Sequence, residues 1–146
     1  MSYLTLAHVQ DRLRKNYAVL YTERGEDAAD ETIVAEDIEA AEADIHSYLA
    51  GRYTVPVTDA EACKLLKHWA LVLLQEIAYG AIPGREVPKN LAAQVTGLRA
   101  RLQKIADGEL SLGTATEIPA AEAGIAGEFI ADGPAPVFER DNMKGF

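Results

Sequence analysis

The stretch from Ala43 to Val57, read ADIHSYLAGRYTVPV, constrains the fold more than any other part of the chain. An acidic amphipathic helical pattern runs up to Leu49, and Gly51 then stands where a left-handed residue commonly ends a helix. The following segment, Arg52 to Val57, is rich in aromatic and β-branched residues, which favour an extended backbone. Because this segment is too short and isolated to build a sheet, we expect it to separate two helices.

The rest of the apolar pattern predicts an all-α fold with four helices, which places the extended segment between the second and the third. Thr5, Asp30 and either Thr58 or Asp59 are suitable N-terminal caps for the first three helices. Pro88 suits the first turn of the fourth helix, as proline commonly does. The expected bounds are about residues 5–15, 30–51, 59–79 and 88–108, with a loop over residues 17–26.

The second and third helices differ in the width of their apolar faces. The third is apolar on most of its circumference around Trp69, which is typical of a central helix. The second has one apolar stripe, and we expect its acidic face, with Glu36, Glu39 and Glu42, to contact solvent or a neighbouring molecule and to carry no chemistry.

Length and charge limit the classes of function. A chain of 146 residues is one domain that is large enough for a hydrophobic core. Its net charge of −9 disfavours binding to nucleic acid, which needs a basic surface. Ten acidic residues lie between Glu23 and Asp44, whereas Glu61 to Asp107 is mildly basic. A solvated helix face is the favoured interpretation, and association of acidic and basic faces between copies is the alternative.

The residues that could carry chemistry form no recognisable constellation. The single cysteine, Cys63, has no cysteine partner, and the three histidines lack the spacing of a zinc site. No glycine-rich phosphate loop or calcium loop is present in the sequence. We therefore expect no catalysis, no metal and no cofactor, and we expect neither a signal peptide nor a membrane span.

The C-terminal residues have a different composition from the helical part. We divide the chain into a helical domain, residues 1–108, and an irregular tail, residues 109–146, which is rich in glycine and proline. The tail either packs on its own domain or on neighbouring copies, and we favour the second because apolar residues are spaced along it. The Arg52–Val57 segment likewise pairs either within the chain or with a neighbour. The residues that we expect to bind partners are Arg52, Tyr53, Val55, Phe129, Val137, Phe138, Arg140 and Phe146.

Several motifs in order resemble one known family over most of the chain. They are AEADIHSYLAGRYTVPV, then LLKHWALVLLQEIAYG, then LRARLQKIADGELSLG, and finally VFERDNMKGF at Val137–Phe146. The series resembles the head-to-tail connector family of Mu-like phages, the gp36-like proteins. The segment AIPGREVPKN, Ala81–Asn90, departs from the charged helical run that is common there in the family.

The resemblance implies a structural role in the virion. It implies an adaptor that forms a ring of about twelve copies under the portal protein, extends the DNA channel, and presents a surface to a stopper or tail-completion protein. Such a protein is assembled in the host cytoplasm and then lies at the head–tail interface. A negatively charged channel wall would repel phosphate and let the duplex pass. The alternative functions are a cytoplasmic helical regulatory or protein-interaction domain without catalysis, and a monomeric helical enzyme.

Overall fold

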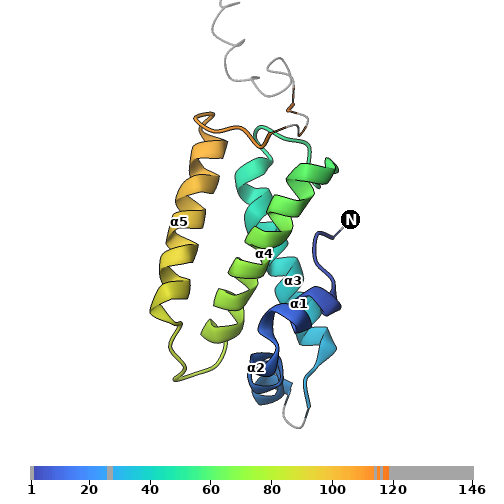
Figure 1. Cartoon of the computed structure of the whole chain (residues 1–146), viewed down its shortest axis with the longest axis vertical. Coiled ribbons are helices and arrows are strands. Elements are labelled where there is room, and N and C mark those ends of the chain that lie inside the picture. Colours follow the sequence, from blue (N-terminus) through green and yellow to red (C-terminus); the bar gives the residue numbers. More distant parts are fainter. Residues whose placement is uncertain (1, 26–27, 114, 116, 119–146) are drawn as a thin grey trace, which may run out of the picture.

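The computed structural model describes residues 2–25, 28–113, 115 and 117–118 (Figure 1). Over these residues the fold is all-α, as predicted, with five helices and no strand. The helices are α1 (Leu6–Leu13), α2 (Lys15–Gly25), α3 (Glu31–Leu49), α4 (Ala60–Gly80) and α5 (Lys89–Ala106).

The three long helices form the body of the molecule. Figure 1 shows α3, α4 and α5 running side by side, with the two short helices packed at one end of α3 and α4. The chain after α5 crosses the opposite end of the bundle, beside the loop that joins α3 to α4. The short helices and this crossing segment therefore close the two ends of a three-helix body.

The core lies around α4, which contacts each of the four other helices. Trp69 on this helix is only 4% exposed, so the prediction that it is a core residue is confirmed. The helix α3 contacts the same number of helices and shares the central position. The buried residues of α4 are Ala62, Leu66, Trp69, Ala70, Val72, Leu73, Leu74 and Ala78.

The loop predicted over residues 17–26 is wrong. Most of this segment forms α2, which is the helix that the prediction of four helices lacked. The helix α1 ends at Leu13 and is followed by Arg14, whose backbone φ of 49° is in the left-handed region. The helix α2 then begins at Lys15. Leu20 and Tyr21 in α2 are fully buried, and Tyr17 is half-buried. The spacing of these three residues by three and four is a helical signal, so the sequence held the information that would have predicted this helix.

Most of the predicted helix ends are confirmed, with one exception. Asp30 and Asp59 cap α3 and α4 by accepting backbone N–H groups, and Gly108 with φ of 85° follows α5. Gly51, by contrast, has no positive φ. The carbonyl of Leu49 accepts the N–H groups of the two residues after Gly51, which completes the end of the helix without a left-handed cap.

Candidate interaction surfaces

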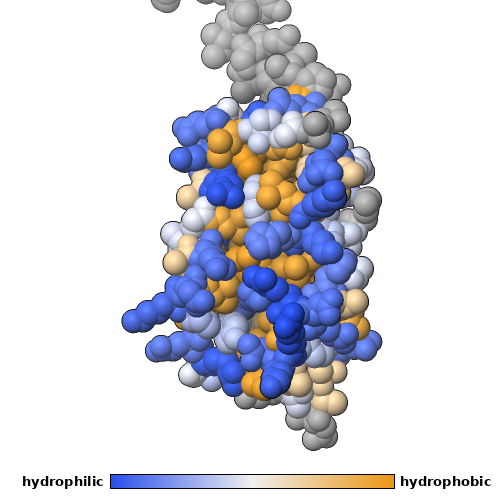
Figure 2. All heavy atoms as spheres, viewed as in Figure 1, coloured by the Kyte–Doolittle hydropathy of each residue, from blue (hydrophilic) through white to orange (hydrophobic). Residues whose placement is uncertain are grey.

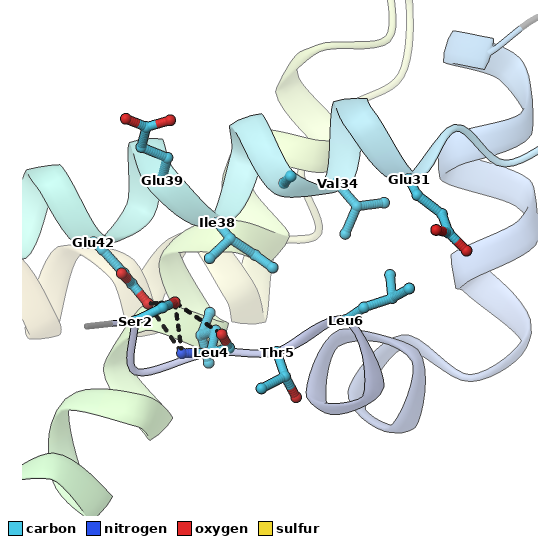
Figure 3. A pocket seen from close by; sticks show the side chains of 10 residues that line it. Ser2, Leu4, Thr5, Leu6, Glu31, Val34, Ile38, Glu39 and Glu42 are labelled. Carbon is cyan, nitrogen blue, oxygen red and sulfur yellow. Dashed lines mark hydrogen bonds between the residues drawn. The ribbon is translucent and has the colours of Figure 1, made fainter.

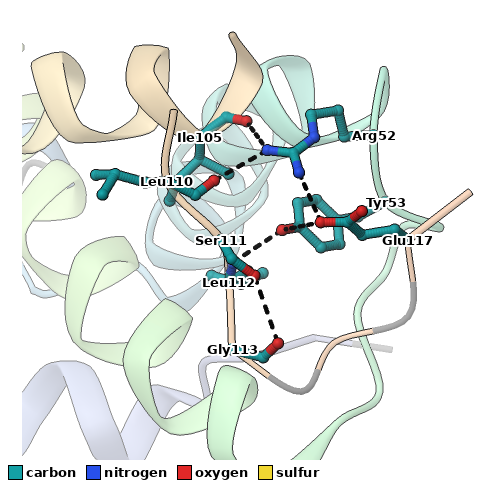
Figure 4. Close-up of polar contacts among 8 residues, drawn as sticks. All are labelled: Arg52, Tyr53, Ile105, Leu110, Ser111, Leu112, Gly113 and Glu117. Carbon is teal, nitrogen blue, oxygen red and sulfur yellow. Dashed lines mark hydrogen bonds and ion pairs between the residues drawn. The ribbon is translucent and has the colours of Figure 1, made fainter. Parts of the chain in front are cut away.

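Arg52 joins the end of α3 to the end of α5. Its Nη1 atom donates hydrogen bonds to the carbonyl oxygens of Ile105 at 2.6 Å and Leu110 at 2.9 Å. Its Nη2 atom forms an ion pair with Glu117 at 2.6 Å (Figure 4). A planar guanidinium has several donors in a fixed geometry, which suits three acceptors supplied by one curving segment. The predicted partner-binding residue Arg52 is thus engaged within its own chain.

Tyr53 is held by the same segment. It is 1% exposed, and its hydroxyl accepts the Leu112 N–H at 2.8 Å and donates to Glu117 at 3.1 Å. The backbone also pairs, because an isolated antiparallel bridge joins Tyr53 to Glu117 and the Ile118 N–H donates to the Arg52 carbonyl at 2.7 Å. Of the two alternatives for this segment, the structure shows pairing within the chain at these two residues, because Glu117 and Ile118 supply the partners.

The remaining predicted partner-binding residues have different positions. Val55 is half-buried against the core. Leu112 and Ala115, which we placed in the tail, are buried in the helical domain, so packing extends beyond residue 108. Partner binding by any of the predicted residues stays a prediction. Five of these residues lie outside the described part of the chain, namely Phe129, Val137, Phe138, Arg140 and Phe146.

Glu42 fixes the N-terminal segment to α3. One of its carboxylate oxygens accepts the Ser2 hydroxyl at 2.7 Å and the Leu4 N–H at 3.0 Å (Figure 3). The same oxygen also accepts the Tyr3 N–H at 2.7 Å. Its exposure is only 8%, so the expectation that it belongs to the solvated acidic face is wrong. A buried carboxylate is stabilised when it accepts several N–H groups, which explains why an acid is tolerated at this position.

Tyr3 and His46 form a partly buried polar contact nearby. The Tyr3 hydroxyl accepts the Val57 N–H at 2.7 Å and lies 3.0 Å from His46 Nε2, with the two rings packed edge to face. Because the hydroxyl already accepts one N–H, its own proton suits an unprotonated Nε2. Burial lowers the pKa of His46, although the nearby Glu42 charge raises it. The neutral imidazole is therefore the form that the folded chain favours.

A groove of about 540 Å³ lies between the N-terminal segment and α3, and we call it the N-terminal groove. Figure 3 shows Val34 and Ile38 pointing toward Leu4 and Leu6, whereas Glu39 points away from that segment. The charged residues that line this groove are all acidic. Its lining consists of Ser2, Leu4, Thr5, Leu6, Glu31, Val34, Ala35, Ile38, Glu39 and Glu42.

A second groove, of about 360 Å³, lies between α4 and α5 beside the end of α1, and we call it the α4–α5 groove. Figure 2 shows hydrophobic side chains emerging between hydrophilic ones over these helices. The ionisable residues that line it are Arg12, His68 and Arg101, and none of its lining residues is acidic. The other lining residues are Leu65, Trp69, Val72, Gln94, Gly97 and Leu98. The two grooves share no residue and have opposite charge.

The sequence model of the family described as bacteriophage Mu, Gp36 matches residues 3–130, which is most of the chain. The chain belongs to the bacteriophage Mu Gp36 family. A comparison with curated proteins found no match. The protein is therefore a phage protein of the Gp36 family, as the resemblance in its motifs implied.

The Gp36 match covers the predicted partner-binding residues unevenly. It includes Arg52, Tyr53 and Val55 in the bundle and Phe129 beyond it. The terminal motif at Val137–Phe146, which contributed to the resemblance, lies outside the matched range. Features common to the Gp36 family therefore concern the helical body and the first part of the tail.

Metal-ligand clusters and membrane-spanning helices are absent from the described part of this Gp36-family chain. Within residues 2–25, 28–113, 115 and 117–118, no three His, Cys, Asp or Glu residues gather as a metal site would require. No helix in this part is both long and apolar enough to cross a bilayer. Burial, followed by the charge of Asp59, raises the pKa of the Cys63 thiol, which disfavours the nucleophilic thiolate.

Proposed function

We propose that this chain is a head-to-tail connector, or adaptor, of a tailed phage. In this role about twelve copies form a ring that docks under the portal protein, extends the DNA channel, and offers a surface to a stopper or tail-completion protein. The role is structural and involves no catalysis. The protein would be assembled in the host cytoplasm and would then reside at the head–tail interface of the virion.

Membership of the bacteriophage Mu Gp36 family is the observation that carries this proposal. The net charge of −9 supports it, because a ring of such chains repels the phosphate backbone and leaves the duplex free to move. The two grooves of opposite charge support it as well, since a ring of identical subunits needs two different surfaces on each copy.

The position of Ile118 supports a role for the tail in this assembly. Ile118 pairs with Arg52 at one end of the bundle, so residues 119–146 start from that end. An extended chain spans about 3.3 Å per residue, so 28 residues can reach up to roughly 90 Å. Phe129, Val137, Phe138 and Phe146 would then anchor this segment in apolar pockets of the portal or a neighbouring copy, and Arg140 would meet an acidic surface.

The proposal is tested by removing the protein from an infecting phage. We expect a phage without this chain to produce filled heads and complete tails that do not join, as seen by electron microscopy of the lysate. Adding the purified full chain to that lysate should restore joined particles and infectivity. Normal joined particles in its absence would contradict the connector role and would favour the alternative, a regulatory or protein-interaction domain in the host cytoplasm.

A further inference from the structure

The outer face of α3 is acidic and carries several small side chains. Glu36 and Glu39 are exposed on it, and the positions around them are occupied by alanine. Small residues on a helix surface allow another element to approach closely, because their short side chains project little from the helix. We call this surface the acidic ridge, and it consists of Ala35, Glu36, Glu39, Ala40 and Ala43.

The α4–α5 groove has the properties that would receive such a ridge. Its floor includes Trp69 and Leu98, which are nearly buried, while Leu65 at its edge is 40% exposed. Gly97 also lines it, and a Cβ atom added there would meet nothing within 4 Å. The α4–α5 groove is thus open to another molecule and has apolar side chains at its base.

The charges of the two surfaces are complementary and uncompensated. Within the described part of the chain, neither Glu39 on the ridge nor Arg101 beside the groove takes part in an ion pair. Arg99, which lies on α5 between the groove residues Leu98 and Arg101, differs because it pairs with Asp44 and Glu76 and ties the three long helices together. Of the two arginines of α5, Arg99 therefore stabilises the bundle, whereas Arg101 is available to another molecule.

We propose that the acidic ridge of one copy seats in the α4–α5 groove of the next copy. This inference rests on the proposed function, because it assigns the two surfaces through which ring subunits would meet. A contact between two different surfaces is heterologous, and repeating it closes a ring when the rotation is suitable. Glu36 and Glu39 would face Arg12 and Arg101, while the alanines of the ridge would cover Leu65 and the groove floor.

Cross-linking tests which surfaces meet. Ala40→Cys and Gly97→Cys are made in separate full-length chains that carry Cys63→Ser, and a short bis-maleimide is added. A mixture of the two chains should form cross-linked pairs, whereas each chain alone should not. Cross-linking of Ala40→Cys to itself would overturn the proposal, because it would indicate a symmetric contact between two ridges. Cys63→Ser alone is the control for background reaction.

A charge exchange tests whether the contact is needed for assembly. Glu39→Arg or Arg101→Glu alone should weaken self-association of the full chain at least about tenfold, and the two changes in one chain should restore most of it. Glu86→Arg and Lys89→Glu are matched controls, because they make the same charge changes at exposed residues that line neither groove. Sedimentation velocity, alone and with portal protein, measures the outcome.

The outcomes separate this inference from the proposed function. If the wild-type chain forms rings and both single variants form them equally well, the ridge and groove assignment is wrong while the connector role stands. If the wild-type chain stays monomeric alone and with portal protein, the connector role fails as well. Binding of duplex DNA that Arg101→Glu abolishes, without any cross-linking between copies, would overturn the inference and assign the groove to nucleic acid.

Discussion

At the scale of single residues, the hydroxyl of Tyr53 helps to close one end of the bundle. It lies between the Leu112 N–H and the Glu117 carboxylate, and the ring around it is almost completely buried. Removing the oxygen leaves a buried N–H without its acceptor, and an unpaired buried donor costs more than the net gain of an ordinary hydrogen bond.

We therefore predict that Tyr53→Phe lowers the free energy of unfolding by about 1–2 kcal/mol. Urea denaturation followed by circular dichroism measures this change. Tyr48→Phe is the matched control, because Tyr48 lies on α3 outside the contact with residues 109–118, and it should change stability by less than about 0.5 kcal/mol. Equal effects of the two changes would contradict the role given to the Tyr53 hydroxyl.

Glu42 and Glu39 provide a second comparison on one helix. Glu42 accepts three hydrogen bonds from the N-terminal segment, whereas Glu39 is exposed. Glu42→Ala should cost about 2–3 kcal/mol because charge-assisted hydrogen bonds to buried donors are lost, and Glu39→Ala should cost less than about 0.5 kcal/mol. The same denaturation experiment checks both values, and a Glu42→Ala chain as stable as wild type would show that the segment needs no anchor.

The lowered pKa of His46 predicts that the stability of the chain depends on pH. Burial lowers its pKa below the ordinary value of 6.5, so the unfolded chain takes up a proton before the folded chain does. Stability that is present above about pH 6.5 is therefore lost as the pH falls toward the lowered pKa of the folded state. The free energy of unfolding, measured with urea, should fall more between pH 7.5 and pH 5.5 in the wild-type chain than in the His46→Gln chain. Equal losses in both chains would show that His46 does not contribute.

At the scale of elements, the sequence predicted what depends on local pattern and missed what depends on distant contacts. The caps at Asp30 and Asp59 and the burial of Trp69 follow from local rules, and they are confirmed. The burial of Glu42 was not predictable in this way, because its partners precede it by about forty residues. The burial of Tyr53 was not predictable either, because its partners Leu112 and Glu117 lie in a segment that local composition assigns to an irregular tail.

The segment 109–118 gives a prediction about where the folded domain ends. A chain that ends after Ile118 retains the contacts of Arg52 and Tyr53 and should be as stable as the full chain. A chain that ends after Leu110 loses the buried Leu112 and should be less stable by at least about 2 kcal/mol. Thermal and urea unfolding of the two truncated chains provide the measurement. Equal stability would place the domain boundary at residue 108, as composition alone indicated.

At the scale of the whole molecule, charge is distributed so that identical copies present unlike surfaces to one another. The N-terminal groove and the adjoining α3 face are acidic, while the α4–α5 groove is basic, although the chain as a whole carries a net charge of −9. Such a molecule is repelled by DNA over long distances and still has a local attraction between copies. This combination suits a subunit of a ring around a DNA channel, which is the role we propose.

Native mass spectrometry of the full chain, alone and mixed with its phage's portal protein, tests this role most directly. We expect the chain to add to the portal ring in one fixed number of copies, about twelve, and we expect no complex in a mixture with an unrelated ring protein. Mass spectra that contain only the free monomer and the unchanged portal ring, at concentrations well above those in an infected cell, would contradict the account.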